Sequence, residues 1–168
     1  MTYFTKILLA ITLSVTSYSF ANAKAIEGEP APSFEAKLMN GQKFSLESTK
    51  GNVVILHFWA TWCPSCLDEM PVLNDFYQKH KDQGIKIIAI SMNDPNEDQE
   101  VIKYIDKFKF DSAFNRNSLF KGYGRVWHLP LTFVVDKKGI LRRNGQVDAT
   151  VLDEKVLEKT VTPLLEKD

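Results

Sequence analysis

The sequence predicts an α/β fold in which helices cover both faces of a central mixed sheet. Residues 53–59 form a near-continuous apolar run bounded by Gly51 and Asn52, which is typical of a strand buried on both faces. Strand-like and helix-like patterns then alternate along the chain, as they do in α/β proteins. The chain has 168 residues, of which 44% are hydrophobic and 25% charged, so one globular domain is expected.

A β-hairpin opens the predicted domain. Residues 34–38 and 42–45 have strand character, and they flank Asn40 and Gly41. An Asn-Gly pair between two such segments is a strong signal for a two-residue hairpin turn, because both positions tolerate the left-handed conformation that the turn requires. We therefore predict a short hairpin ahead of the first long strand.

Helical and strand patterns follow that strand in turn. Residues 64–80 have apolar side chains at helical spacing, so we predict a helix with a kink at Pro71. Residues 85–91 predict another buried strand. Residues 96–108 predict a second helix, which follows the chain-breaking residue Pro95.

The C-terminal part predicts a second hairpin and a final helix. Residues 131–135 and 140–143 are strand-like, and the turn sequence 136–139 separates them. The last helix is expected to begin near Thr150, because Thr150 and Asp153 have the spacing of a capping box.

Residues 1–23 predict a signal peptide that is not part of the fold. One basic residue precedes the apolar stretch 7–20, and Ala21 and Ala23 supply the small residues that signal peptidase accepts, so we expect cleavage after Ala23. The 14 residues of the stretch are too few to span a bilayer, which needs about 20. The mature chain, residues 24–168, is then one domain exported to a disulfide-permissive compartment, most simply the bacterial periplasm.

The balance of charge excludes two classes of partner. The chain has 21 Lys and Arg residues against 21 Asp and Glu residues, with no run of like charges. A nucleic-acid partner would require a basic stripe that neutralises phosphates, and a membrane-surface anchor would require a polybasic segment. We expect neither nucleic acid nor a membrane surface as a partner.

The candidate chemistry lies at Cys63 and Cys66, which directly follow the strand 53–59 and begin the next helix. A thiolate at a helix N-terminus faces unpaired backbone N–H groups and the positive end of the helix dipole, so the anion of Cys63 should be stabilised. Cys66 lies one turn further in and should act as the more buried, resolving thiol. Pro64, near the first helical position, needs no N–H partner and stiffens the loop. The pair therefore predicts a redox-active dithiol.

Other roles for the two cysteines stay open at this point. A purely structural disulfide would close a very short loop, which contributes only about 2 kcal/mol by chain entropy, against roughly 3 kcal/mol for about fifteen residues. A structural zinc site would require a full set of ligands, and the sequence adds only three His residues and no second paired motif. A peroxide-reducing thiol would be oxidised to sulfenic acid at Cys63 and resolved by Cys66.

Residues 54–66, together with residues 67–71, resemble the active-site region of thioredoxin-like proteins, and more narrowly that of exported TlpA/ResA-like thiol-disulfide oxidoreductases. The resemblance covers nearly the whole mature chain, including an extra segment between Ile90 and Leu119. The specific signal is a Trp-Cys-x-x-Cys motif at a strand–helix junction combined with a downstream Pro-x-Thr-Phe strand in residues 128–133. It implies a thioredoxin-like fold with an N-terminal β-hairpin and an inserted helical segment.

The resemblance also implies roles for three residues of the predicted helix. Cys63 matches the exposed nucleophile and Cys66 the resolving thiol. Glu69 lies three residues after Cys66, on the same side of the helix, and matches an acidic residue that this family places near the dithiol. Burial would raise the pKa of Glu69 and make it a proton acceptor for Cys66. The alternative is a solvated Glu that is favoured by the helix dipole.

Four further residues are implied in substrate binding. Pro130 matches the proline whose preceding peptide bond is cis and which packs opposite the dithiol. The backbone of Leu129 would pair with an extended substrate segment, a small case of strand addition. Trp62 would offer a flat apolar contact beside the dithiol, and Pro64 belongs to the same region.

His57 and the Pro-Ser pair between the cysteines depart from the family pattern. The other two histidines suggest no role. His57 stands where thioredoxin has Asp and the exported relatives often have Asn. We expect a hydrogen-bonded core residue; the alternatives are a proton relay to Cys66 and a charged imidazole that lowers the pKa of the dithiol. The sequence Pro-Ser between the cysteines differs from the Glu-Pro of many relatives, so their redox potential cannot be transferred. His128 is expected on the surface, and His80 ends a helix, where a cation suits the dipole.

These observations predict an exported thiol-disulfide oxidoreductase that works as a monomer without a cofactor or metal. The resemblance implies reduction of disulfides in exported proteins such as apocytochrome c during cytochrome c maturation, with a membrane electron donor of the CcdA/DsbD type. One alternative is a peroxiredoxin-like peroxidase, although Thr61 lies one position too close to Cys63 for the Thr-x-x-Cys pattern. The other is a Sco-like copper chaperone that uses both thiolates and His128, although its cysteines would be one residue further apart.

Overall fold

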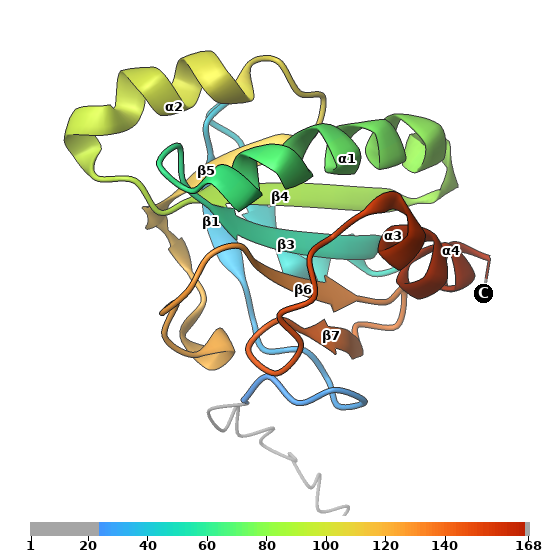
Figure 1. Cartoon of the computed structure of the whole chain (residues 1–168). Helices are drawn as coiled ribbons and strands as arrows, with labels where there is room; N and C mark the ends of the chain where they lie inside the picture. Colours follow the sequence, from blue (N-terminus) through green and yellow to red (C-terminus); the bar gives the residue numbers. More distant parts are fainter. Residues whose placement is uncertain (1–23, 167–168) are drawn as a thin grey trace, which may run out of the picture.

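The computed structural model of the protein describes residues 24–166, so the predicted signal peptide lies outside the described residues. In this part of the chain, a mixed seven-stranded sheet has the order β2-β1-β5-β4-β3-β6-β7 (Figure 1). Its strands are β1 (Glu35–Leu38), β2 (Lys43–Ser45), β3 (Val53–Trp59), β4 (Ile85–Ser91), β5 (Asp111–Leu119), β6 (Leu131–Val135) and β7 (Leu141–Asn144). The α-helices are α1 (Pro64–His80), α2 (Asp98–Ile105), α3 (Glu154–Thr160) and α4 (Thr162–Leu165), and the 3-10 helices are η1 (Leu46–Thr49), η2 (Lys81–Gln83), η3 (Pro95–Glu97) and η4 (Lys121–Tyr123). The predicted α/β fold with a mixed sheet is confirmed.

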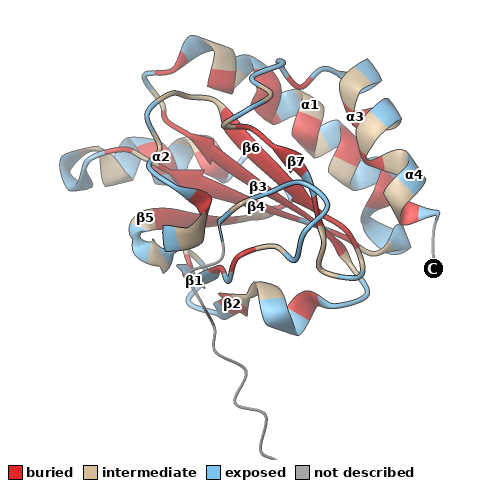
Figure 2. Ribbon diagram, turned by 90° about the horizontal axis from the view of Figure 1, so that it is seen from below, coloured by how far each residue is buried: buried red, intermediate tan, exposed pale blue. Residues whose placement is uncertain are grey.

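The centre of the sheet is parallel. β3 pairs in parallel with β4, in the register that places Trp59 opposite Ser91, and β4 pairs in parallel with β5. β6 runs antiparallel to β3 and places Leu131 opposite Phe58. Every residue of β3 is buried, as its apolar run predicted (Figure 2). The carboxyl ends of β3 and β4 and the amino end of β6 therefore meet at one edge of the sheet, where the chain enters α1.

Both predicted hairpins are present. β1 and β2 pair antiparallel across a turn in which Gly41 has a φ of 88°, a conformation that favours glycine, and the Asn40 side chain accepts a backbone hydrogen bond within this turn. β6 and β7 also pair antiparallel. Their turn is closed by Asp136, whose Oδ1 accepts the N–H groups of Lys138 and Ile140, each at 2.9 Å.

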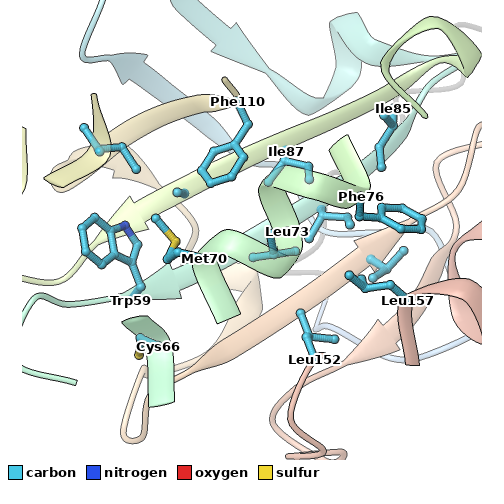
Figure 3. Close-up of a cluster of buried hydrophobic side chains, with 14 of the residues drawn as sticks. Trp59, Cys66, Met70, Leu73, Phe76, Ile85, Ile87, Phe110, Leu152 and Leu157 are labelled. Atoms are coloured by element: carbon cyan, nitrogen blue, oxygen red, sulfur yellow. The ribbon is translucent and has the colours of Figure 1, made fainter. Parts of the chain in front are cut away.

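The α-helices and the two 3-10 helices η1 and η4 cover different faces of the sheet. Alternate side chains of β3 point to opposite faces, and one set belongs to a core cluster that includes buried residues of α1, α2, α3 and α4. Met70 of α1 and Leu157 of α3 are examples, and Figure 3 shows them in this cluster. The other cluster contains Tyr123 of η4 and packs against Leu46 of η1. Helices lie on both faces, as predicted, but the α-helices share one of them.

Helix α1, which carries the dithiol, begins directly after its N-cap, Cys63, and continues through Pro71. Pro71 has no N–H to donate to the carbonyl of Leu67. The hydroxyl of Tyr104 on α2 donates to that carbonyl instead, at 3.2 Å. The carbonyl that the proline leaves free is thus satisfied by the neighbouring helix, and α1 remains one element across the position where a kink was expected.

Two helices differ in extent from the sequence prediction, and β5 was not predicted. The helix expected over residues 96–108 is divided into η3 and the shorter α2. The last helical region begins at Glu154 instead of near Thr150, because Asp153 is the N-cap and its carboxylate accepts the N–H of Val156 at 2.7 Å. No helix within residues 24–166 is long and apolar enough to cross a membrane.

Candidate active site

The two cysteines form a disulfide at the amino end of α1. The Cα atoms of Cys63 and Cys66 are 5.3 Å apart, and the backbone N–H of Cys66 donates to Cys63 Sγ at 3.3 Å. Pro64 occupies the first turn, as predicted. Cys63 is 6% exposed and Cys66 is fully buried. Cys63 is therefore the more accessible of the two, but it is not the exposed residue that the resemblance implied, because in the disulfide form both cysteines pack into the core cluster around α1.

A hydrogen-bond network holds the loop that leads into the dithiol. Asn93 lies just after β4 and is buried. Its Oδ1 accepts the N–H of Thr61 at 3.1 Å, and its Nδ2 donates to the Thr61 hydroxyl at 2.8 Å. The same Nδ2 donates to Glu97 Oε2 at 3.2 Å. Asn93 thus connects the residues before Cys63 to the segment between β4 and α2.

Glu69 lies on the buried side of α1, one turn after Cys66, and is 2% exposed. Its Oε1 accepts the N–H of Leu152 at 2.8 Å, whereas its Oε2 has no hydrogen-bond partner among the described residues. Burial raises the pKa of Glu69 to about 7, although the Leu152 hydrogen bond and the positive charge of Arg143 oppose this rise. Glu69 occupies the buried position that the proton-acceptor hypothesis requires.

His57 is completely buried on β3, directly opposite Thr132 of β6. Its Nδ1 lies 2.9 Å from Thr132 Oγ1 and 3.8 Å from Glu69 Oε2. Burial lowers the pKa of His57 to about 3, so the imidazole is neutral near pH 7. His57 is the hydrogen-bonded core residue that was expected, and it also lies next to the Glu69 carboxyl.

Arg143 of β7 shapes the loop that carries Leu152. Its guanidinium is buried, and Nη1 lies 3.0 Å from Asp148 Oδ2. Nη2 donates to the backbone carbonyls of Asp148 and Thr150, at 3.2 and 2.6 Å. These bonds hold the loop between β7 and α3 against the sheet, and this loop presents the Leu152 N–H to Glu69.

The segment before β6 lies at the same edge of the sheet as the dithiol. Because Leu131 is opposite Phe58, the residues just before Leu131 lie beside the end of β3, where the chain turns toward Cys63. The Leu129–Pro130 peptide bond is cis, as the resemblance implied. Half-buried Leu129 packs against the core cluster that contains both cysteines.

Exposed tryptophans flank these segments. Trp62 precedes Cys63 and is 60% exposed, as its predicted role in substrate contact requires. Trp127, three residues before Pro130, is 70% exposed, and its ring lies 4.3 Å from that of His128. Trp127 was missed by the sequence analysis, because a single tryptophan in a loop belongs to no periodic pattern.

Neither of the other two histidines forms a hydrogen bond or an ion pair with the dithiol or with Glu69 in the part of the chain that the structure describes. His128 is half-buried, so the expectation of a surface residue was wrong: both ring nitrogens are buried and have no hydrogen-bond partner among residues 24–166. His80 ends α1, and its Nδ1 lies 3.1 Å from Gln83 Oε1. The described residues contain no group of three or more His, Cys, Asp or Glu side chains placed to hold a metal ion.

The sequence matches the AhpC/TSA family over residues 27–144, which is more than half of the chain. The chain belongs to the AhpC/TSA family. A relative of this AhpC/TSA protein is the thiol-disulfide oxidoreductase ResA of Bacillus cereus (strain ATCC 10987 / NRS 248), which is 33% identical over 165 residues, or 94% of this chain and 92% of ResA. ResA of Geobacillus kaustophilus (strain HTA426) is 31% identical over 140 residues, which cover 82% of this chain and 79% of that protein.

Solved structures of other thiol-disulfide proteins have the same fold as this AhpC/TSA protein. A thiol:disulfide interchange protein of the thioredoxin family from Chlorobium tepidum TLS superposes with a TM-score of 0.68 at 25% identity, and covers 85% of this chain and 99% of its own. StoA from Bacillus subtilis superposes with a TM-score of 0.60 at 26% identity, with 80% and 97% covered. With the disulfide of Cys63 and Cys66, these relatives establish a thiol-disulfide oxidoreductase of the ResA type on a thioredoxin fold.

The Asn93 network of this AhpC/TSA protein predicts a stability effect. Asn93→Ala removes a partner of two polar groups of Thr61, of the Ser91 hydroxyl and of the Glu97 carboxylate, so we expect a loss of about 1–3 kcal/mol in the free energy of unfolding. Chemical denaturation of the oxidised protein measures this loss.

The matched control is Asn96→Ala, because Asn96 is an exposed asparagine in the same connection. We expect the control to change the free energy of unfolding by less than about 0.5 kcal/mol. Equal effects of the two substitutions would show that the network does not stabilise the loop.

Proposed function

We propose that this protein is an exported reductant of protein disulfides, and that Cys63 is its nucleophile and Cys66 its resolving thiol. The observation that carries this proposal is the Cys63–Cys66 disulfide at the start of α1, with the buried carboxyl of Glu69 on the same helix. The predicted signal peptide 1–23 supports export to the periplasm. The peroxidase and copper-chaperone alternatives are supported by no contact of this site.

The reduced dithiol donates two electrons in two displacements. The thiolate of Cys63 attacks one sulfur of the substrate disulfide, that S–S bond breaks, and the other substrate sulfur leaves as a thiolate and takes a proton. Cys66 then gives its proton to Glu69 and attacks Cys63 Sγ; the mixed disulfide breaks, and the second substrate sulfur leaves as a thiolate that takes a proton from solvent. The Cys66 N–H that donates to Cys63 Sγ stabilises negative charge on that sulfur. The disulfide seen in the structure is the product state of this cycle.

The substrate segment is proposed to lie beside the cis peptide bond. Leu129 and Pro130 are half-buried at the edge where β6 begins, so the Leu129 backbone can pair with an extended chain. Trp62 and Pro64, which flank Cys63 along the chain, are exposed and offer apolar surface next to the dithiol. This arrangement suits an unfolded or extended segment better than a compact one.

The physiological partners follow from the family resemblance. We propose that the substrates are disulfide-containing exported proteins, among them apocytochrome c before haem attachment in cytochrome c maturation. A reductant in an oxidising compartment requires a source of electrons, and a membrane donor of the CcdA/DsbD type would supply it. The protein is proposed to act as a monomer without a bound cofactor.

The equilibrium reduction potential of the Cys63/Cys66 pair tests the proposal. Thiol trapping across a series of dithiol redox buffers is expected to give a value near or below about −250 mV, which is typical of reductants. A value near about −120 mV would instead place the protein among the donors of disulfides. Consumption of hydrogen peroxide by the reduced protein at a rate above its disulfide reduction would favour the peroxidase.

A further inference from the structure

The residues around the Glu69 carboxyl come from several elements, and some of them favour its ionised form. The Leu152 N–H binds Oε1, and the positively charged Arg143 of β7, itself paired with Asp148, favours ionisation. On its own helix, Cys66 lies in the first turn, and Cys63 is the N-cap that precedes it. These groups leave Oε2 without a partner among the described residues.

The group that faces Oε2 is the imidazole of His57. His57 Nδ1 is 3.8 Å from Oε2, which is too far for a hydrogen bond but close enough for one to form after a small shift of either side chain. Nδ1 is also 2.9 Å from Thr132 Oγ1. The imidazole therefore lies between a hydroxyl that fixes its ring and a carboxyl oxygen that lacks a partner.

The surroundings of His57 select its tautomer. Nε2 is buried and has no partner among residues 24–166. If the proton were on Nε2, the structure would contain a buried N–H donor without an acceptor, which is costly. With the proton on Nδ1, the N–H can donate to Thr132 Oγ1, and the unpaired buried nitrogen is an acceptor instead of an N–H donor. The Nδ1–H tautomer thus directs its hydrogen toward the side on which Thr132 and Glu69 Oε2 lie.

Ionisation of Glu69 increases the stabilisation that the His57 N–H can provide to its carboxyl group. A protonated Glu69 can keep its hydrogen on Oε2 and gains little from a donor, whereas a buried carboxylate is stabilised strongly by every N–H that points at it. His57 stays neutral during this change, because burial lowers its pKa to about 3. A neutral imidazole can act as a donor to Glu69 without taking up the proton.

We propose that His57 is a positioning residue for Glu69: its Nδ1–H, oriented by Thr132, meets Oε2 when Glu69 loses its proton, and so determines how readily Glu69 gives up and takes up a proton. The catalytic relevance of this inference rests on the proposed role of Glu69 as proton acceptor. The physical coupling between His57 and Glu69 does not depend on that role. The coupling and the proton-acceptor role can therefore be disproved separately.

Direct titration of the Glu69 carboxyl tests the coupling without any measurement of activity. The infrared band of the protonated carboxyl, assigned by its absence in Glu69→Gln, gives the midpoint of ionisation. In His57→Leu we expect the midpoint to rise by about one pH unit, which means an approximately tenfold smaller ionised fraction below the midpoint. His57→Asn places an N–H donor near the position of Nδ1 and is expected to restore the original midpoint.

Thr132→Val is the second variant, in case His57→Leu does not fold. It keeps the imidazole but removes the hydroxyl that orients it, so the midpoint should move upward by a smaller amount. The inference is overturned if neither His57→Leu nor Thr132→Val moves the midpoint, or if His57→Asn moves it as far as His57→Leu does.

A second readout separates this inference from the proposed function. The rate of release from a preformed mixed disulfide on Cys63, measured against pH, should shift in parallel with the carboxyl midpoint in His57→Leu. If the carboxyl titration shifts and the release rate does not, the coupling stands and the role of Glu69 as proton acceptor fails.

Discussion

Replacement of Cys66 by serine is expected to stop turnover and to trap a mixed disulfide between Cys63 and the substrate. The nucleophile is then intact, but the sulfur that should displace the product is missing. Steady-state reduction of a protein disulfide should fall by at least about a thousandfold. Non-reducing electrophoresis and intact-mass spectrometry would show an adduct equal to the mass of the protein plus one substrate chain.

Cys63→Ser is the matched variant, because it removes the other sulfur of the same disulfide. It should lose activity to the same extent but form no adduct, since Cys66 is fully buried. An adduct on Cys66 in Cys63→Ser, at the rate seen for Cys63 in Cys66→Ser, would reverse the assigned roles. Turnover retained by either variant would contradict dithiol catalysis.

Glu69→Gln is expected to make the protein more stable in alkaline solution and to leave its stability unchanged in acid. The pKa of Glu69 is raised from 4.5 to about 7 in the folded protein, so the folded state holds this proton more tightly than the unfolded chain does. Glu69 therefore costs no stability below pH 4.5, and the cost grows as the pH rises from 4.5 to about 7. At about 1.4 kcal/mol per unit, the cost reaches at most about 3 kcal/mol.

Gln cannot ionise, but it keeps a carbonyl oxygen that can accept the N–H of Leu152. The free energy of unfolding of Glu69→Gln should thus equal that of the unchanged protein near about pH 4 and exceed it by up to about 3 kcal/mol near about pH 8. Denaturant titrations at several pH values measure the difference. The titration of His57 is common to both proteins and cancels in this comparison.

Asp68→Asn is the control, since Asp68 is an exposed carboxyl on the same helix. Its effect should stay within about 0.5 kcal/mol at both pH values. A gain for Glu69→Gln of equal size at both pH values would mean that the amide packs better for reasons unrelated to charge. No gain at the higher pH would mean that Glu69 ionises in the folded protein at little cost.

The elements predicted well from the sequence are those whose local pattern matches their burial. β3 is a run of apolar residues and is buried throughout, and the apolar spacing of α1 gave both of its ends correctly. β5 was missed because its sequence is mostly polar, and only residues 112–114 are buried. It is a strand because β4 pairs with one side of it and β1 with the other, which is a property of the assembled sheet.

The candidate site likewise contains residues that the local sequence pattern predicts and residues that it does not predict. The positions of Cys63, Cys66 and Glu69 follow from spacing along one helix, so the sequence was sufficient to place them together. The groups that surround the Glu69 carboxyl come from other elements. Leu152 is 83 residues away along the chain, and His57 lies near Glu69 only because β3 packs against α1. No pattern within a short segment could have revealed these contacts.

The hydrogen bond from Tyr104 to the carbonyl of Leu67 joins the inserted segment to the helix that carries the dithiol. Pro71 leaves that carbonyl without its helical donor, and the donor comes from α2. Residues 71 and 104 are therefore coupled: as long as Pro71 is present, loss of the Tyr104 hydroxyl would leave the Leu67 carbonyl without its donor. The segment that contains α2 thus completes the hydrogen bonding of α1, and removing it would cost the dithiol helix a contact.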